Sequence, residues 1–90
     1  MRELDDIQQM LDTGHVEEAI ELLKRRIAAN PADDRALYTL GNAYCRLNDW
    51  KHALGSYCLA LEINPSSPAG QAYEKVQEIL NFYCHDLYNP

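Results

Sequence analysis

Two cysteines, a histidine and an aspartate fall within the short stretch YCRLNDWKHALGSYC at residues 44–58. Side chains of these types could bind a metal ion or support thiol chemistry. A structural zinc site needs about four ligands that converge on one point. Helical spacing instead puts Cys45 and Cys58 on opposed faces of a helix pair, and the adjacent Cys84 and His85 would point about 100° apart on a helix. We therefore predict no metal site and no cofactor.

Catalysis by a thiol would also require a base within hydrogen-bond reach and a pocket that excludes water. The three histidines, His15, His52 and His85, fall at polar positions or at helix ends, where a solvated side chain is expected. The sequence contains no glycine-rich phosphate loop, no paired-carboxylate motif and no nucleophile elbow. We therefore predict that the protein is not an enzyme and has no catalytic residue. A thiol-dependent enzyme is kept as the third alternative.

Composition and charge narrow the class of protein further. Residues 1–90 fit one domain, and the 47% hydrophobic and 24% charged content is that of a folded globular protein. The net charge of -6 argues against binding to nucleic acid or to an anionic membrane, because both need a basic face. No apolar run approaches the roughly 20 residues of a membrane span, and the first residues are too polar for a signal peptide. With three cysteines in no disulfide framework, the chain is predicted to be cytoplasmic.

Apolar residues recur at helical spacing along the whole chain. Pro31 and Pro65 disfavour helix at the residue before them, and Asp33 and Ser67 are suited to cap the helices that follow. No alternating stretch rich in valine, isoleucine and threonine competes as a strand. The sequence therefore predicts an all-α fold with five helices, near residues 2–13, 16–29, 34–47, 50–63 and 68–86.

The chain also repeats itself at an offset of 34 residues. The offset places Ala19 on Ala53, Ile20 on Leu54, Leu23 on Tyr57, Ile27 on Leu61 and Asn30-Pro31 on Asn64-Pro65. Residues 34–67 resemble a tetratricopeptide repeat, and the matching positions are Leu37, Leu40, Gly41, Tyr44, Ala53, Tyr57, Ala60 and Pro65. Small residues at Gly41 and Ala53 would let the two helices of this unit approach closely. The resemblance implies an α-α superhelix, and the chain looks like a small stand-alone bacterial member of the family.

The single domain is expected to contain two helix pairs and a cap. Residues 1–33 resemble a degenerate copy of the repeat, because Asp6 and Ile7 stand where leucine and glycine are expected and Arg26 replaces a small residue. We expect looser helix packing there. Residues 68–90 would supply the capping helix that repeat arrays need, followed by a short tail. In the register of the repeat, the positions of this helix that would face a following partner helix are Gln71, Glu74, Lys75 and Glu78.

The resemblance implies an interaction module that binds a peptide or a partner protein in the concave groove formed by the first helix of each repeat. The central repeat is the least acidic part of the chain, with three basic and two acidic residues in 35–66 against four and nine in 1–34. Arg35 and Arg46 are expected to meet acidic or C-terminal carboxylate groups of the ligand, and Asn42 to bond to its main chain. The residues expected to line the groove are Leu4, Gln8, Leu11, Arg35, Tyr38, Asn42, Cys45 and Arg46.

Two other interpretations stay open. The groove residues could be solvated without binding a ligand. Alternatively, the protein could be a self-assembling, homodimeric structural subunit that uses its C-terminal helix, whose apolar stripe is wider than one helix contact needs. Phe82 lies nearly opposite that stripe, and Leu87 and Tyr88 follow it. These three residues form the predicted interface.

Overall fold

The computed structural model describes residues 4–83, and the side chains of residues 4–80. All regular structure in this part of the chain is helical. The helices are α1 (Leu4–Asp12), α2 (Val16–Ala29), α3 (Asp34–Arg46), α4 (Trp50–Ile63) and α5 (Ala69–Tyr83). The predicted all-α fold with five helices is confirmed. The predicted outer ends of the first and last helices, residues 2–3 and 84–86, lie outside the described residues.

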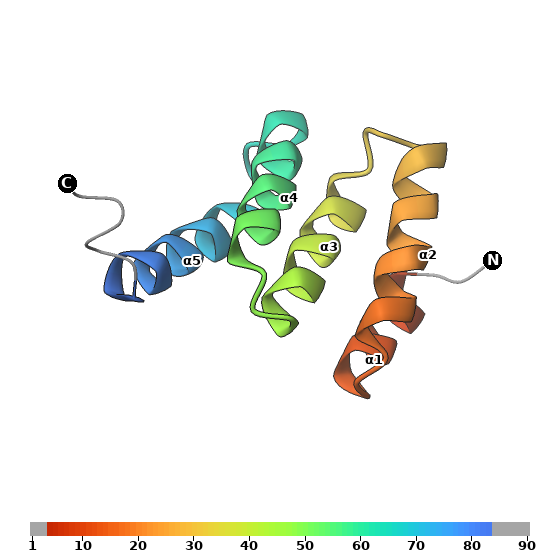
Figure 1. Cartoon of the computed structure of the whole chain (residues 1–90). Coiled ribbons are helices and arrows are strands. Elements are labelled where there is room, and N and C mark those ends of the chain that lie inside the picture. Colours follow the sequence, from red (N-terminus) through yellow and green to blue (C-terminus); the bar gives the residue numbers. More distant parts are fainter. Residues whose placement is uncertain (1–3, 84–90) are drawn as a thin grey trace.

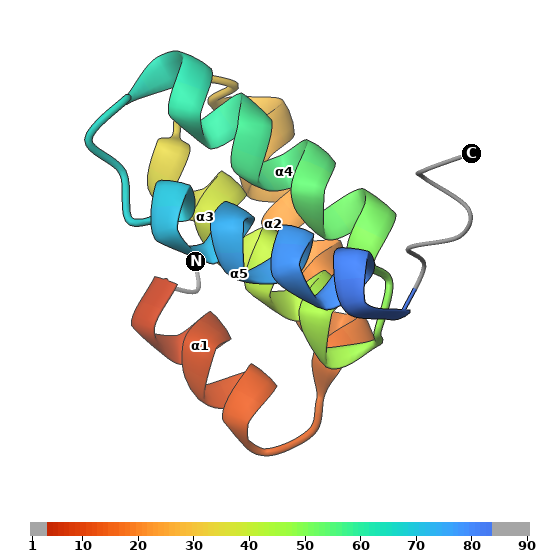
Figure 2. The same ribbon diagram turned by 90° about the vertical axis from the view of Figure 1, so that its left-hand side faces the viewer.

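The helices form two antiparallel pairs and a fifth helix, stacked side by side (Figure 1). α3 packs against α4 of its own pair and against α2 of the preceding pair, and α5 packs against α4. α2 and α4 flank α3 on one side of the molecule, whereas α1 contacts α3 from the opposite side, as the perpendicular view shows (Figure 2). The result is the predicted superhelical stack, with α2 and α4 as an outer layer.

Aspartate side chains fix where α3 and α4 begin. Asp33 accepts a hydrogen bond of 3.1 Å from the Ala36 N–H, and Asp49 accepts one of 3.3 Å from the His52 N–H. Such caps satisfy backbone donors that have no partner within the helix. A further hydrogen bond from the His52 side chain, with Nδ1 at 2.9 Å from Oδ1, holds the pKa of Asp49 below its ordinary value of 3.8. Before this cap the chain turns at Asn48, whose φ is 58°.

The two helix pairs fill the same contact with different combinations of side-chain sizes. In the second pair Gly41 faces Tyr57, and a Cβ added at Gly41 would lie 2.6 Å from Tyr57 Cδ1. The equivalent residues of the first pair are Ile7 and Leu23, which are 2% and 0% exposed and belong to one core cluster. Both side chains are thus well buried, but the backbones of α1 and α2 approach each other much less closely than those of α3 and α4, as expected for the first pair. Leu23 is smaller than Tyr57, so it leaves room for a large side chain on the facing helix.

Arg26 occupies the position where the second pair has the buried Ala60. Its side chain is 32% exposed, and its Nε lies 3.0 Å from Oδ2 of Asp33, the residue that caps α3. An ion pair to the next helix thus stands where the second pair has a close helix contact. The neighbouring Ile27 packs against both core clusters and so links the two pairs.

We predict that the size of residues 41 and 57 is coupled. Gly41→Ala should lower the free energy of unfolding by about 1–3 kcal/mol, because Tyr57 is 1% exposed and has no room to move away from the added methyl group. Tyr57→Leu alone should also destabilise by leaving a cavity. The double variant, which approaches the Ile7–Leu23 arrangement, should be more stable than the sum of the two changes by at least about 0.5 kcal/mol. Urea unfolding of the four proteins measures this coupling, and strictly additive effects would contradict it.

Candidate functional site

A groove crosses α3 between α1 and α5. The backbones of these three helices can be followed in Figure 2. It consists of two adjoining hollows of about 510 Å³ each, which share Gln8, Tyr38 and Pro68. α1 forms one wall, α5 forms the other, and the floor is α3 with the buried Tyr57 of α4 below it. The groove is therefore assembled from four of the five helices, and no single repeat contains it.

The structure places all but one of the predicted groove residues in this groove. Leu11 is the exception, because it is 1% exposed and belongs to the core cluster of the first pair. It is thus a packing residue, and its prediction as a groove residue is corrected. The others line one or both hollows: Leu4, Gln8, Arg35, Tyr38, Asn42, Cys45 and Arg46.

The sequence interpretation missed the contribution of α5. Ala69 and Val76 are buried in the same core cluster as Tyr57 and Ala60 of α4, at 0% and 3% exposure. This orientation turns Gln71 and Lys75 toward the groove. The sequence had instead predicted that both residues would face a following helix. The apolar stripe of α5 could have revealed this rotation, because packing the stripe against α4 fixes which residues of α5 face the groove.

A hydrogen-bond network holds the floor of the groove. The Tyr57 hydroxyl donates to Asn42 Oδ1 at 2.6 Å, and Cys45 Sγ lies 3.4 Å from the same hydroxyl oxygen. The Tyr38 ring lies against Tyr57, with ring centroids 6.0 Å apart. Because Asn42 Oδ1 is engaged by Tyr57, the NH₂ group of Asn42 is the part of the amide left to donate to a ligand. Burial, with the Cys45 contact as a second cause, raises the pKa of Tyr57 far above its ordinary value of 10.0.

The positively charged side chains of the groove differ in whether they already have a carboxylate partner. Arg46 Nη2 lies 2.9 Å from Asp12 Oδ1 of α1, so this guanidinium already has a carboxylate partner. The ion pairs within the described residues do not include Arg35 or Lys75. Asp34 lines the hollow that contains Arg35, and it accepts a 3.1 Å hydrogen bond from Asn64 Nδ2. No carboxylate lines the hollow that contains Lys75.

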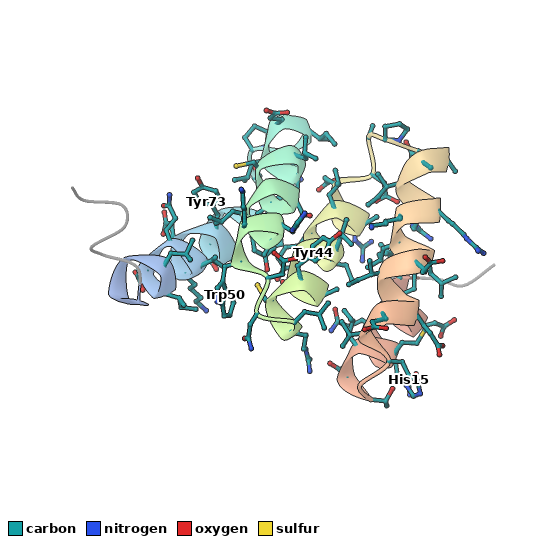
Figure 3. The ribbon with its side chains drawn as sticks, in the orientation of Figure 1. His15, Tyr44, Trp50 and Tyr73 are labelled. Atoms are coloured by element: carbon teal, nitrogen blue, oxygen red, sulfur yellow. The ribbon has the colours of Figure 1, made fainter. Side chains whose placement is uncertain are left out.

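The thiols and histidines have ordinary surroundings. Cys45 and Cys58 are free, the first half-buried in the groove and the second exposed on α4. His15 lies at the turn between α1 and α2 (Figure 3), with Nδ1 3.0 Å from Thr13 Oγ1. Within the described residues, no three histidine, cysteine, aspartate or glutamate side chains are grouped so that they could hold a metal ion.

The predicted C-terminal interface falls beyond what the structure describes. Phe82 belongs to α5, but its side chain lies outside the described residues, as do Leu87 and Tyr88. That interface therefore stays a prediction. Along residues 4–83, every helix is too short or too polar to cross a membrane.

Comparison with known proteins gives one family match. Residues 10–76 match the family model described as "Tetratricopeptide repeat". The chain is also 29% identical over 73 residues to cellulose synthase operon protein C of Escherichia coli K12 and to its putative counterpart in Escherichia coli O157:H7. These matches cover 81% of this chain but only 6% of either relative. The chain thus spans a small part of the length of the curated relatives.

A solved structure is similar over nearly the full length. The solution NMR structure of Bacteroides fragilis protein BF1650 superimposes with a TM-score of 0.90 at 43% sequence identity. The match covers 99% of this chain and 91% of that one. The fold is therefore shared with a bacterial protein of nearly the same extent.

We predict that Tyr57 makes stability fall at alkaline pH. An unfolded tyrosine ionises near pH 10, whereas the folded protein holds the Tyr57 proton to much higher pH. The contribution of this pKa difference to the free energy of unfolding is therefore fully present below about pH 10. It is lost as pH rises above that value, by up to about 1.4 kcal/mol per pH unit. Tyr57→Phe should cost about 1 kcal/mol at neutral pH but lose less stability above pH 10. Urea unfolding at neutral pH and above pH 10 tests this, with Tyr38→Phe as control. Parallel curves of unfolding free energy against pH for Tyr57→Phe and wild type would contradict it.

Proposed function

Because the chain belongs to the tetratricopeptide repeat family, we propose that it is a protein interaction module whose groove over α3 binds an extended segment of a partner protein. The family is generally a non-catalytic interaction repeat. The observation that carries the proposal is the fixed Asn42 amide on the groove floor, held by Tyr57 at 2.6 Å. A donor that is already oriented loses little conformational freedom when it binds a ligand.

The groove offers contacts suited to a peptide backbone and to apolar side chains. The Asn42 NH₂ group can donate to a ligand carbonyl, and the half-buried Tyr38 presents a ring with a polar end beside it. Trp50 and Ile79 add apolar surface to the hollow that contains Asn42 and Lys75. Figure 3 shows Trp50 near α5. Ligands of this kind combine backbone hydrogen bonds for affinity with side-chain pockets for specificity.

We assign a carboxylate of the ligand to the hollow that contains Lys75. Lys75 is exposed, and no acidic residue lines its hollow. Arg46 lies in the same hollow but is paired with Asp12, so its pairing with a ligand would first break that contact. The expected role in carboxylate binding therefore moves from Arg46 to Lys75. Arg35 serves the other hollow, where Asp34 is also present.

The relatives do not supply the partner. Cellulose synthase operon protein C matches this chain over only 6% of its own length, so the match carries the repeat and not the function of the whole relative. The ligand class follows from the groove alone, and it is a peptide segment with an acidic side chain or a C-terminal carboxylate.

Selection from a random peptide library displayed on phage tests the proposal. The selected peptides should carry an acidic group, and in NMR titrations they should shift amide signals of α1, α3 and α5. Lys75→Gln should weaken their binding about tenfold, which is about 1.4 kcal/mol. Gln77→Glu changes the net charge by the same amount on the same helix, but Gln77 does not line the groove, so it should leave binding unchanged.

Two results would contradict this function. Signal shifts confined to α2 and α4 would place the binding surface on the outer layer. Equal effects of Lys75→Gln and Gln77→Glu would show that the carboxylate does not bind where we assign it.

A further inference from the structure

The outer faces of α2 and α4 expose the same positions of the repeat. Seven residues of α2 are exposed, and the offset of 34 residues converts each of them into an exposed residue of α4. They are Glu17, Glu18, Glu21, Lys24, Arg25, Ala28 and Ala29 on α2, and Lys51, His52, Gly55, Cys58, Leu59, Glu62 and Ile63 on α4. The two helices run in the same direction on the near side of the molecule (Figure 1). The outer layer thus presents two equivalent but chemically different helix faces.

A hollow of about 620 Å³ lies beside α4 on this outer layer. Leu40 and Tyr44 of α3 form its floor, and Figure 3 shows Tyr44 between α2 and α4. Leu59 at its edge is 51% exposed, the largest exposed fraction among the big hydrophobic residues that the structure describes. Ser56 also lines the hollow. This surface therefore leaves apolar area exposed to solvent.

Gly55 in this hollow is not required by the fold of the chain. It lies inside α4, where glycine is less favourable than alanine by about 0.5–1 kcal/mol. Gly41 excludes a side chain because Tyr57 packs on it, but a Cβ at Gly55 would meet no atom within 4 Å. A helix glycine that faces open space permits another backbone to approach closely.

The charges of the two faces are complementary to each other. Glu17 and Glu18 at the start of α2 correspond to Lys51 and His52 at the start of α4. The ion pairs recorded within the described residues do not include Glu17, Glu18 or Lys51. Further along, Arg25 of α2 corresponds to the apolar Leu59 and Glu62 of α4 to Ala28, so the opposite charges lie at the starts of the two helices. A surface that is complementary to itself after exchange of its two halves is what a two-fold dimer requires.

We propose that a second copy of this chain docks on the outer layer, with α2 of each copy over α4 of the other. A two-fold axis parallel to these helices would bring Glu17 of one copy to Lys51 of the other, twice in the dimer. It would also set α2 of the second copy over Gly55 and the hollow lined by Leu59. This interface leaves the groove over α3 free, so it does not depend on the proposed function.

Sedimentation equilibrium of the full chain over about a hundredfold range of concentration tests the proposal. Wild type should show a concentration-dependent dimer. Lys51→Glu and Glu17→Lys should each weaken dimerisation at least about tenfold, because each places like charges together. The combined exchange should restore it. Gln77→Glu on the exposed side of α5 changes the charge outside the interface and should leave the dimer as it is.

A second pair of variants separates docking from folding. Gly55→Ala should weaken the dimer and Gly55→Gln should weaken it further, by about tenfold or more, because each adds side-chain atoms where the partner backbone approaches. Both variants should raise the Tm of the monomer, since both residues favour helix over glycine. A wild type that stays monomeric over the whole range overturns the proposal. So does a dimer that the Lys51, Glu17 and Gly55 variants leave unchanged, or a combined exchange that fails to restore association.

Discussion

The contact between Gly41 and Tyr57 is the constraint on which the second repeat and the groove both depend. The missing side chain at Gly41 lets the Tyr57 ring lie against α3, where it is 1% exposed. Only from this depth does its hydroxyl reach Asn42 Oδ1 at 2.6 Å and lie 3.4 Å from Cys45 Sγ. The close contact between α3 and α4 at Gly41 therefore also orients the Asn42 amide on the groove floor.

The first helix pair reaches a filled contact by a different route. Ile7 and Leu23 are two side chains of similar size where the second pair has Gly41 and Tyr57, and Arg26 replaces a small residue by an ion pair with Asp33. Close packing needs the summed volume of facing side chains to match the space, and it does not fix which helix carries the larger one. The first copy of the repeat therefore buries its facing side chains although its two helices approach less closely than α3 and α4 do.

The molecule presents two opposite surfaces with different chemistry. The groove combines an oriented amide, aromatic side chains and the cations Arg35 and Lys75. The outer layer combines apolar area around Leu59 with opposite charges at the starts of α2 and α4. Since α3 contributes to both surfaces, by Tyr38 and Asn42 on one side and by Leu40 and Tyr44 on the other, one rigid helix separates the two proposed contacts.

The sequence by itself determined the helices, their order and most of the groove. Proline and aspartate residues set the helix ends locally. Residues three or four apart on α3 must share a face, which is why the sequence predicted Tyr38, Asn42, Cys45 and Arg46 together. Only the tertiary structure decided how each helix is rotated about its axis. That rotation buries Leu11, turns Lys75 into the groove and brings Asp12 to Arg46. It could not be predicted locally, because it depends on the volumes of facing side chains and on charges that are far apart in the chain.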